Sequence, residues 1–325
     1  MNLHQNQAQF QDAIRLTADR LKLPASFIEK DYWVCLALYT IFQHKLGQDI
    51  IFKGGTALSK CFHLIERFSE DIDLFVVKNP GDSEHKLKSK LKRISNLVSS
   101  IIPEVKTSNL VRKMGMHRKT VHEYPQIFQL NSSQIRGHLL IESSWLGHHE
   151  PLTQNYINSY IGQVLLESQN IEQIKLFQLT PFLVKSIDPT RTICEKIMSL
   201  VRFSHSENPI QDLKNKIRHA YDLHILLNES NYKLFFYSKS FDILLNQVGQ
   251  EDFISYRNNN KWLRFHPCEA LIFIDLIGIW PTLKTTYQTE FKNLVYGYFP
   301  NESEIFNSLK MIQERLRSIH WELNT

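Results

Sequence analysis

Apolar and polar residues follow a helical spacing at the start of the chain. This pattern predicts a helix over residues 2–21, which Pro24 ends, and a second, strongly apolar helix over 27–45. Ser26 precedes the second helix and Glu29 follows three residues later, as in a capping box. We therefore expect Ser26 to cap this helix.

Shorter apolar runs come next and predict strands. Residues 49–53 form one buried strand and residues 72–77 another, with a helix over 56–65 between them. Gly54 and Gly55 mark the turn from the first strand into that helix. The order of strand, Gly-Gly turn, helix and strand is the predicted centre of an N-terminal lobe.

The rest of the chain is predicted to be mostly helical. A helix over 83–102 precedes a polar segment of less regular pattern at 112–119, and further strands are expected over 136–142 and 180–187. The pattern after Thr190 predicts helices over 191–203, 212–227, 232–248, 281–295 and 302–323. Helices therefore dominate the C-terminal part.

This order of elements predicts an α+β, or mixed α/β, fold of two lobes. The N-terminal lobe, 1–188, would hold a small mixed sheet with helices packed on it, with its core motifs at 50–77 and a third strand at about 136–142. Residues 189–325 would form a mostly helical lobe. We expect the boundary near Asp188-Pro189.

The composition narrows the class of protein. Hydrophobic residues make up 42% of the 325 positions and charged residues 22%, which is ordinary for a globular protein, and the net charge of +5 permits a nucleotide or nucleic-acid partner without requiring one. The four cysteines are far apart, so we expect a reducing cytoplasm and neither a zinc ribbon nor a disulfide framework. We find no signal peptide, and the longest apolar stretch, 34–42, is about half the length of a membrane helix. We therefore expect no membrane partner.

Asp71 and Asp73 are the candidate centre of the chemistry. In a strand, positions i and i+2 share a face, so the two carboxylates project together while Ile72 and Leu74 face the core. Carboxylates about 7 Å apart repel each other unless they share cations. We therefore expect this pair to bind Mg²⁺, because paired metal ions activate an attacking hydroxyl and stabilise a leaving pyrophosphate.

The Gly-Gly turn is a candidate phosphate site. Two glycines leave no side chain between the backbone and a ligand, so phosphate oxygens can reach backbone N–H groups at the start of the helix. A Gly-Gly turn alone, or an Asp-x-Asp pair alone, is more often structural, but their conjunction favours phosphoryl transfer. The expected nucleotide-binding residues are Lys53, Gly54, Gly55, Thr56, Ser59 and Arg67, with Lys60 as a further possible cation.

Two segments together resemble a known family. Phe52-Lys-Gly-Gly-Thr-Ala-Leu-Ser59 and Arg67-Phe-Ser-Glu-Asp-Ile-Asp-Leu74 resemble the motif of the AbiEii/AbiGii-type nucleotidyltransferase toxins, which belong to the DNA polymerase β-like nucleotidyltransferase superfamily. The resemblance covers about 29–227. It includes three further segments, Glu29-Lys-Asp-Tyr-Trp33, Thr192-Ile-Cys-Glu-Lys196 and Arg218-His-Ala-Tyr-Asp-Leu223.

The resemblance implies a Mg²⁺-dependent enzyme that moves a nucleoside monophosphate from a nucleoside triphosphate to an acceptor. It implies the toxin of a toxin–antitoxin or phage-defence pair, with a cognate antitoxin as partner. It nominates Lys196 and Asp222 as active-site residues from the helical lobe. The superfamily commonly adds a third carboxylate, for which Glu142 is the candidate because it shares a strand face with Leu140; a solvent-facing acid is the alternative. Glu142 would take the acceptor's proton or complete the metal coordination.

The resemblance also supplies the acceptor class, RNA such as the 3′ end of tRNA. The basic run Lys86, Lys88, Lys90, Lys92 and Arg93 would favour the approach of a phosphate backbone, although a solvated helix face explains the run equally well. Two alternatives stay open: nucleotide transfer to a protein or small-molecule hydroxyl, and a non-catalytic partner-binding module. The histidines, including His219 and His224 beside Asp222, show no zinc spacing, so we expect structural roles for them.

Overall fold

The computed structural model describes residues 2–69, 71–106, 109–129, 137–256 and 259–323. The chain divides into two compact units, each built from more than one stretch of sequence. The first unit comprises Met1–His63, Phe68–Trp145 and Leu152–Ser186, and the second comprises Leu64–Arg67, Leu146–Pro151 and Ile187–Thr325. No helix among the described residues is long and apolar enough to cross a membrane.

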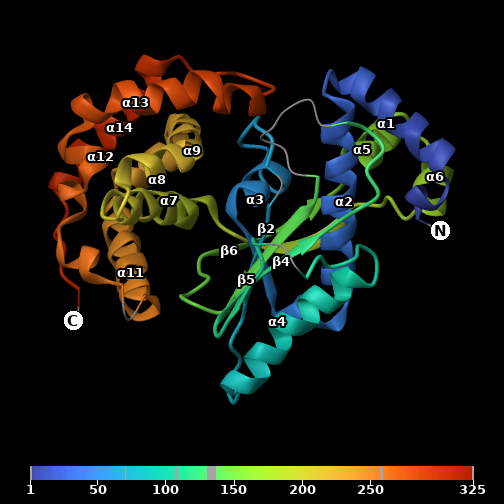
Figure 1. Cartoon of the computed structure of the whole chain (residues 1–325), viewed down its shortest axis with the longest axis horizontal. Helices are drawn as coiled ribbons and strands as arrows, with labels where there is room; N and C mark the ends of the chain where they lie inside the picture. The colour runs from blue at the N-terminus through green and yellow to red at the C-terminus, as the bar shows by residue number, and fades with distance from the viewer. Residues whose placement is uncertain (1, 70, 107–108, 130–136, 257–258, 324–325) are drawn as a thin grey trace. The chain divides into compact units, whose positions relative to one another are not determined.

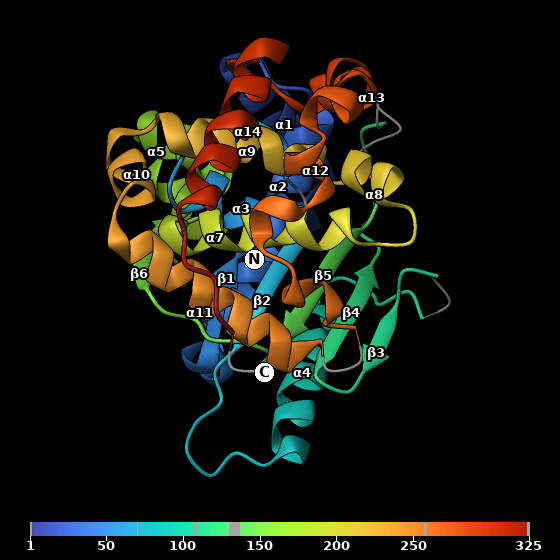
Figure 2. The ribbon, with the colours of Figure 1, turned by 90° about the vertical axis from the view of Figure 1, so that its left-hand side faces the viewer.

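A mixed sheet forms the centre of the first unit, and the described residues contribute seven strands to it in the order β3-β4-β5-β2-β1-β7-β6. β2 lies between β1, to which it is antiparallel, and β5, to which it is parallel (Figure 2). The strands are β1 (Ile50–Lys53), β2 (Asp71–Val76), β3 (Arg112–Met114), β4 (His117–His122), β5 (Leu139–Ser144), β6 (Leu152–Ile157) and β7 (Phe182–Ile187).

One face of this sheet carries the hydrophobic core of the first unit. Because side chains alternate along a strand, Ile72, Leu74 and Val76 of β2 point to the same face and are at most 2% exposed. They pack in one cluster with apolar residues of α2 and α4, and Figure 1 shows α2 running beside the sheet. The helices of this unit are α1 (Gln7–Leu21), α2 (Ala25–Phe42), α3 (Gly54–Lys60), α4 (Glu84–Ser99), α5 (Tyr160–Glu167) and α6 (Ile171–Leu176).

A buried ion pair joins α2 to α3. Nζ of Lys60 lies 2.6 Å from Oδ1 of Asp31, and the other oxygen of Asp31 accepts a hydrogen bond from the backbone N–H of Tyr160 at 2.7 Å. Burial lowers the pKa of Lys60, but the carboxylate of Asp31 outweighs burial and holds that pKa above its usual range. The ammonium of Lys60, named above as a further cation for phosphate, is thus paired with Asp31 inside the first unit.

The second unit is helical. Its helices pack on one another, and Figure 1 shows α7, α8 and α9 beside one another. The short segment Leu64–Arg67 joins this unit through an antiparallel bridge between Arg67 and Val295. The helices are α7 (Pro189–Ser204), α8 (Pro209–Asn215), α9 (Ile217–Asn228), α10 (Ser230–Phe236), α11 (Lys239–Ser255), α12 (Leu271–Ile274), α13 (Leu276–Thr289) and α14 (Glu302–Arg317).

The structure confirms the mixed α/β fold class. The prediction that Ser26 and Glu29 form a capping box at the start of α2 is wrong. α2 begins at Ala25 directly after Pro24, so Ser26 lies inside the helix. The carboxylate of Glu29 accepts hydrogen bonds from the backbone N–H groups of Ile127 and Phe128 at 2.7 and 2.9 Å. Glu29 is buried, and its carboxylate binds backbone N–H groups of a distant loop. It does not bind the N–H groups at the start of α2, as a capping box would require.

Several element boundaries also differ from the prediction. β3 and β4 form in the polar segment 112–119, and β6 was not predicted. Residue 136 of the predicted third strand lies outside the described residues, and that strand is β5. The predicted helices 212–227 and 232–248 are each divided into two. The side chain of Asp275 accepts from the N–H of Gly278, so α13 starts before Pro281, where the prediction placed its start.

We expect Asp31→Ala to destabilise the protein by about 3–5 kcal/mol, because it leaves the Lys60 ammonium buried without its carboxylate. The measurement is urea unfolding. The matched control is Arg20→Ala, which breaks an exposed pair with Glu167 at 3.1 Å and should cost under about 1 kcal/mol. Equal losses for the two variants would contradict the structural role of the buried pair.

Candidate active site

Asp71 and Asp73 stand at the start of β2 on the face opposite the core. Both are partly exposed, whereas Ile72 and Leu74 between and after them are buried. The register pairs Asp73 with Lys53 of β1 on one side and with Glu142 of β5 on the other. Directly paired residues project to the same face of a sheet. The sheet therefore brings Lys53, Asp73 and Glu142 into one row.

Gly54 allows the carboxylate of Asp73 to approach the backbone. Its φ of +80° is in the left-handed region, and a Cβ atom at this position would lie 2.1 Å from Oδ2 of Asp73. The side chain of Asp73 thus occupies the space beside the first residue of α3. Gly54 is required here both for its backbone conformation and for its missing side chain.

Thr56 ties α3 to the beginning of β2. Its hydroxyl donates to the backbone carbonyl of Asp71 at 2.6 Å, and its Oγ1 lies 3.0 Å from the hydroxyl of Ser69. Thr56 is buried, while Gly55 and Ser59 of the same helix are partly exposed. The hydroxyl of Thr56 is therefore used to fix the acidic strand.

Glu142 is ion-paired within the sheet. Its carboxylate contacts Nζ of Lys119, the residue directly opposite on β4, and lies 3.5 Å from Nε2 of His117. Burial raises the pKa of Glu142, but the hydrogen bonds from His117 and Lys119 outweigh it and lower the pKa to about 2. Glu142 is therefore ionised at neutral pH and is a weak proton acceptor.

The donor set beside Gly54 fits a magnesium ion. Among the described residues there is no group of three or more His, Cys, Asp or Glu side chains arranged to hold a metal. Asp71 and Asp73 instead offer two carboxylates on one face, and Mg²⁺ is usually held by one or two carboxylates together with phosphate oxygens and water. A site of this kind would be completed by its substrate.

A second cluster of charges lies within the helical unit. Nζ of Lys196 on α7 lies 2.7 Å from Oδ2 of Asp222 on α9, and the guanidinium of Arg67 contacts both oxygens of the same carboxylate. All three side chains are at most 6% exposed. The structure thus brings the two predicted residues Lys196 and Asp222 together, and it adds Arg67, which was expected with the nucleotide-binding residues.

Positive charge exceeds negative charge in this second cluster. Burial raises the pKa of Asp222, but Arg67 and Lys196 outweigh it and lower that pKa. The pKa of Lys196 is lowered, chiefly by burial, and Arg67 and Arg218 lower it further. Burial and the same cations hold the pKa of His219 well below its usual value. Such an excess of positive charge favours a bound anion.

His219 lies next to Lys196, and the structural role expected for it stays a prediction. Its Nδ1 lies 3.5 Å from Nζ of Lys196. It stands three residues before Asp222, a spacing that puts both side chains on one face of a helix. This spacing is the sequence signal that places His219 beside Asp222.

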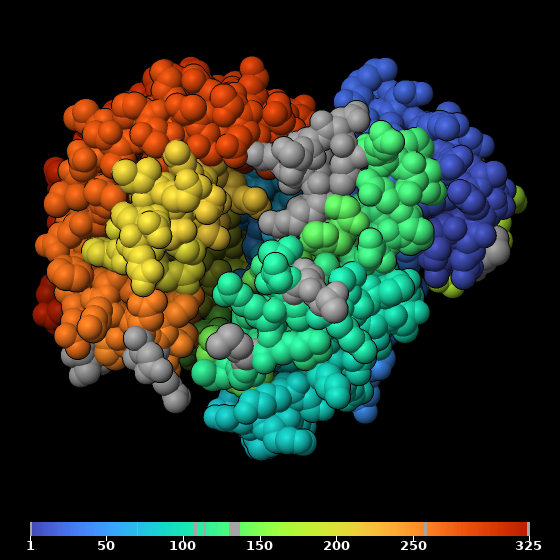
Figure 3. Space-filling view, viewed as in Figure 1, coloured from blue at the N-terminus to red at the C-terminus, as the bar shows by residue number. Residues whose placement is uncertain are grey.

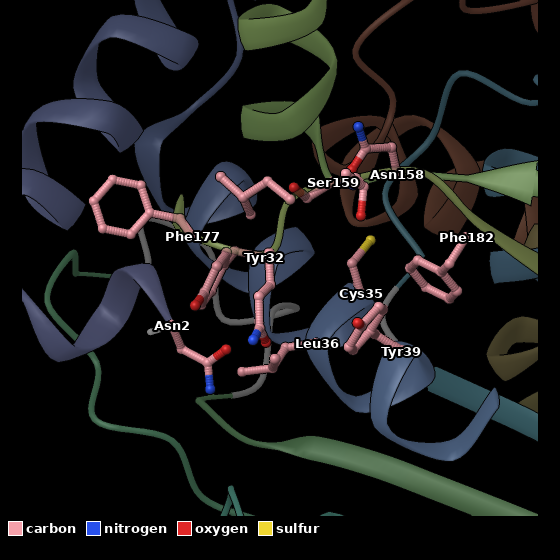
Figure 4. A pocket seen from close by; sticks show the side chains of 12 residues that line it. Asn2, Tyr32, Cys35, Leu36, Tyr39, Asn158, Ser159, Phe177 and Phe182 are labelled. Carbon is pink, nitrogen blue, oxygen red and sulfur yellow. The ribbon is translucent and has the colours of Figure 1, made fainter. Parts of the chain in front are cut away.

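A pocket elsewhere in the first unit contains none of the predicted site residues. Figure 4 shows Tyr32, Cys35 and Tyr39 of α2 on one side of it, with Asn158 and Phe182 nearby. Burial raises the pKa of the Cys35 thiol to about 12, so this cysteine is not a nucleophile at neutral pH. The predicted site residues therefore lie outside this pocket.

The family model described as nucleotidyl transferase AbiEii toxin, type IV toxin–antitoxin system, matches residues 36–261. This range includes the Gly-Gly turn, Asp71, Asp73, Glu142, Lys196 and Asp222. No curated protein matches the sequence.

We expect Gly54→Ala to destabilise the protein more than Gly81→Ala by about 1–3 kcal/mol in urea unfolding. Both glycines have a φ of +80°, so both variants carry the same backbone strain. A Cβ at Gly81 meets nothing within 4 Å, whereas a Cβ at Gly54 collides with Asp73. If the two variants unfold at the same urea concentration, the contact with Asp73 is not a packing constraint.

Proposed function

Since the chain belongs to the AbiEii nucleotidyl transferase toxin family of type IV toxin–antitoxin systems, we propose that it transfers a nucleoside monophosphate from a nucleoside triphosphate to RNA, with Mg²⁺ held by Asp71 and Asp73. The family is one of nucleotidyl transferases and implies an antitoxin partner. The observation that carries the proposal is the row of Lys53, Asp73 and Glu142 beside the backbone of Gly54.

The transfer is a displacement at phosphorus. An acceptor hydroxyl attacks the α-phosphorus, a new P–O bond forms, the bond to the bridging oxygen breaks, and pyrophosphate leaves. When bound, Mg²⁺ would offset phosphate charge and stabilise the leaving group. The N–H groups of Gly54 and Gly55 would bind phosphate oxygens, because no side chain covers this backbone.

Glu142 would assist without taking the acceptor's proton. A proton acceptor works best when its pKa is near the working pH, and the pKa of Glu142 is about 2. We assign it to holding Lys119 on the same face as Asp73, where the ammonium would offset phosphate charge. The proton of the acceptor would then pass to water.

Lys196 and Asp222 would act in the same reaction. Arg67 and Lys196 both contact the carboxylate of Asp222, and these cations would stabilise an anionic triphosphate or the departing pyrophosphate. Lys196 would supply the charge, and Asp222 would hold the ammonium at 2.7 Å.

The acceptor site would include α4, with one correction to the predicted basic face. Lys90 is buried and its ammonium lies 2.6 Å from Asp82 and 2.8 Å from Asp49, so it cannot contact an RNA backbone without breaking these pairs. Figure 3 shows the segment that contains α4, coloured cyan, at the molecular surface. The exposed basic residues of α4 are Lys86, Lys88, Lys92 and Arg93.

Asp73→Asn should lower nucleotide transfer at least about 100-fold without unfolding the protein, because the amide keeps the shape and removes the charge. The assay incubates the purified chain and Mg²⁺ with each α-³²P-labelled nucleoside triphosphate and total cell RNA or protein. Asp19→Asn, an exposed acid of the same unit, is the matched control and should keep full activity. Unchanged labelling by a folded Asp73→Asn chain would refute the metal assignment. Label found in protein alone would refute the RNA acceptor.

Replacing Lys88, Lys92 and Arg93 with Gln should raise the KM for RNA and leave the KM for the nucleotide unchanged. Each lost phosphate contact should flatten the slope of log affinity against log salt by about 0.9 on a duplex acceptor stem. The control removes the same charge from other exposed sites, Lys233, Lys239 and Lys310. Identical RNA kinetics in the two triple variants would show that α4 is only a solvated surface.

A further inference from the structure

The guanidinium of Arg67 uses two of its nitrogens on one carboxylate. Nε lies 2.6 Å from Oδ1 of Asp222, and Nη2 lies 2.7 Å from Oδ2. The two side chains are 1% and 0% exposed. A bidentate pair fixes the rotation of the carboxylate, because both oxygens are held against the planar guanidinium. Asp222 therefore keeps one orientation while Arg67 is in place.

One oxygen of this carboxylate is shared with the lysine. Oδ2 of Asp222 lies 2.7 Å from Nζ of Lys196 as well as 2.7 Å from Nη2 of Arg67. The contact of Lys196 with His219 is longer, at 3.5 Å, and hence weaker. The position of the Lys196 ammonium thus depends on the orientation of Asp222, which Arg67 sets.

The backbone at Arg67 is held independently of its side chain. Arg67 forms an antiparallel bridge with Val295. The carbonyl of the preceding residue, Glu66, accepts from the N–H groups of Tyr296 and Gly297 at 3.0 and 3.2 Å. A change confined to the guanidinium leaves these bonds in place. The segment should therefore stay folded in a variant that alters only the end of the side chain.

Nε and Nη2 of Arg67 are both bonded to Asp222 and the side chain is 1% exposed, so a nucleotide that took either nitrogen would first have to break the pair. The carboxylate of Asp222 would then stay buried with one cation fewer, and separating a buried ion pair is strongly unfavourable. The geometry is better suited to a fixed support than to a mobile ligand-binding group. This differs from the nucleotide-binding role that the sequence suggested for Arg67.

We propose that Arg67 is a positioning residue of the transfer reaction. Arg67 fixes the orientation of the Asp222 carboxylate, and this carboxylate in turn fixes the position from which the Lys196 ammonium acts. The inference rests on the proposed function, because it concerns the working of the Lys196–Asp222 pair. Substitution of a positioning residue lowers kcat, whereas substitution of a residue that contacts the nucleotide raises the KM for the nucleotide.

The test compares Arg67→Lys with Arg191→Lys. Arg191 is a matched control, since it is 2% exposed, lies in the same unit and binds the carboxylate of Glu251, away from Asp222. In both variants lysine keeps the charge and loses the two-pronged contact. Labelling kinetics are measured with the α-³²P-labelled nucleotide well below both melting temperatures.

We expect Arg67→Lys to lower kcat about 10- to 100-fold with a nucleotide KM within about threefold of the parent, and Arg191→Lys to keep kcat within about twofold. In a Lys196→Met background, Arg67→Lys should change the remaining rate by less than about twofold, since the ammonium that it positions is gone. This non-additivity separates positioning from a general loss of stability.

Three results would overturn the inference alone: an unchanged kcat in Arg67→Lys, a nucleotide KM raised more than about tenfold with kcat unchanged, or equal kcat losses in Arg67→Lys and Arg191→Lys. Two other results would overturn the proposed function and the inference with it. A parent chain that labels no acceptor removes the reaction, and full activity in Lys196→Met removes the role of the pair.

Discussion

The close approach of the Asp73 carboxylate to the backbone of Gly54 is the constraint on which the candidate site depends. A side chain at Gly54 would occupy the position of Oδ2. The same turn begins α3, whose Thr56 hydroxyl binds the carbonyl of Asp71. The turn therefore fixes both acidic residues. The missing side chain of Gly54 leaves room for the carboxylate of Asp73, and the hydroxyl of Thr56 binds the backbone carbonyl of Asp71. A side chain at Gly54 would therefore act on the Asp73 carboxylate through packing.

Each of the two units carries its own cluster of charged side chains. The first carries carboxylates on an exposed sheet face, which suit a cation, and the second carries a buried excess of cations, which suits an anion. Pairing within each cluster limits the cost of these charges: Lys119 neutralises Glu142, and Arg67 and Lys196 surround Asp222.

The parts of this arrangement that could be predicted were those governed by local periodicity. The common face of Asp71 and Asp73 follows from the two-residue repeat of a strand, and the mixed α/β class follows from the order of apolar runs. The register that sets Glu142 beside Asp73 could not be predicted, because it joins strands about seventy positions apart through a parallel pairing. The buried pair of Arg67 was missed for the same reason. Polar strands such as β4 lack a buried-face pattern strong enough to reveal them.

The bond between Arg67 and Asp222 joins residues 155 positions apart. At a ribosomal speed of about 5–20 residues per second, Asp222 is made roughly 8–30 seconds after Arg67. During that interval the nascent chain already contains the whole acidic strand but has no carboxylate to receive this guanidinium. A chain that ends before Asp222 therefore lacks the bidentate pair, and the contacts of Arg67 and Lys196 with this carboxylate form only after Asp222 has been made.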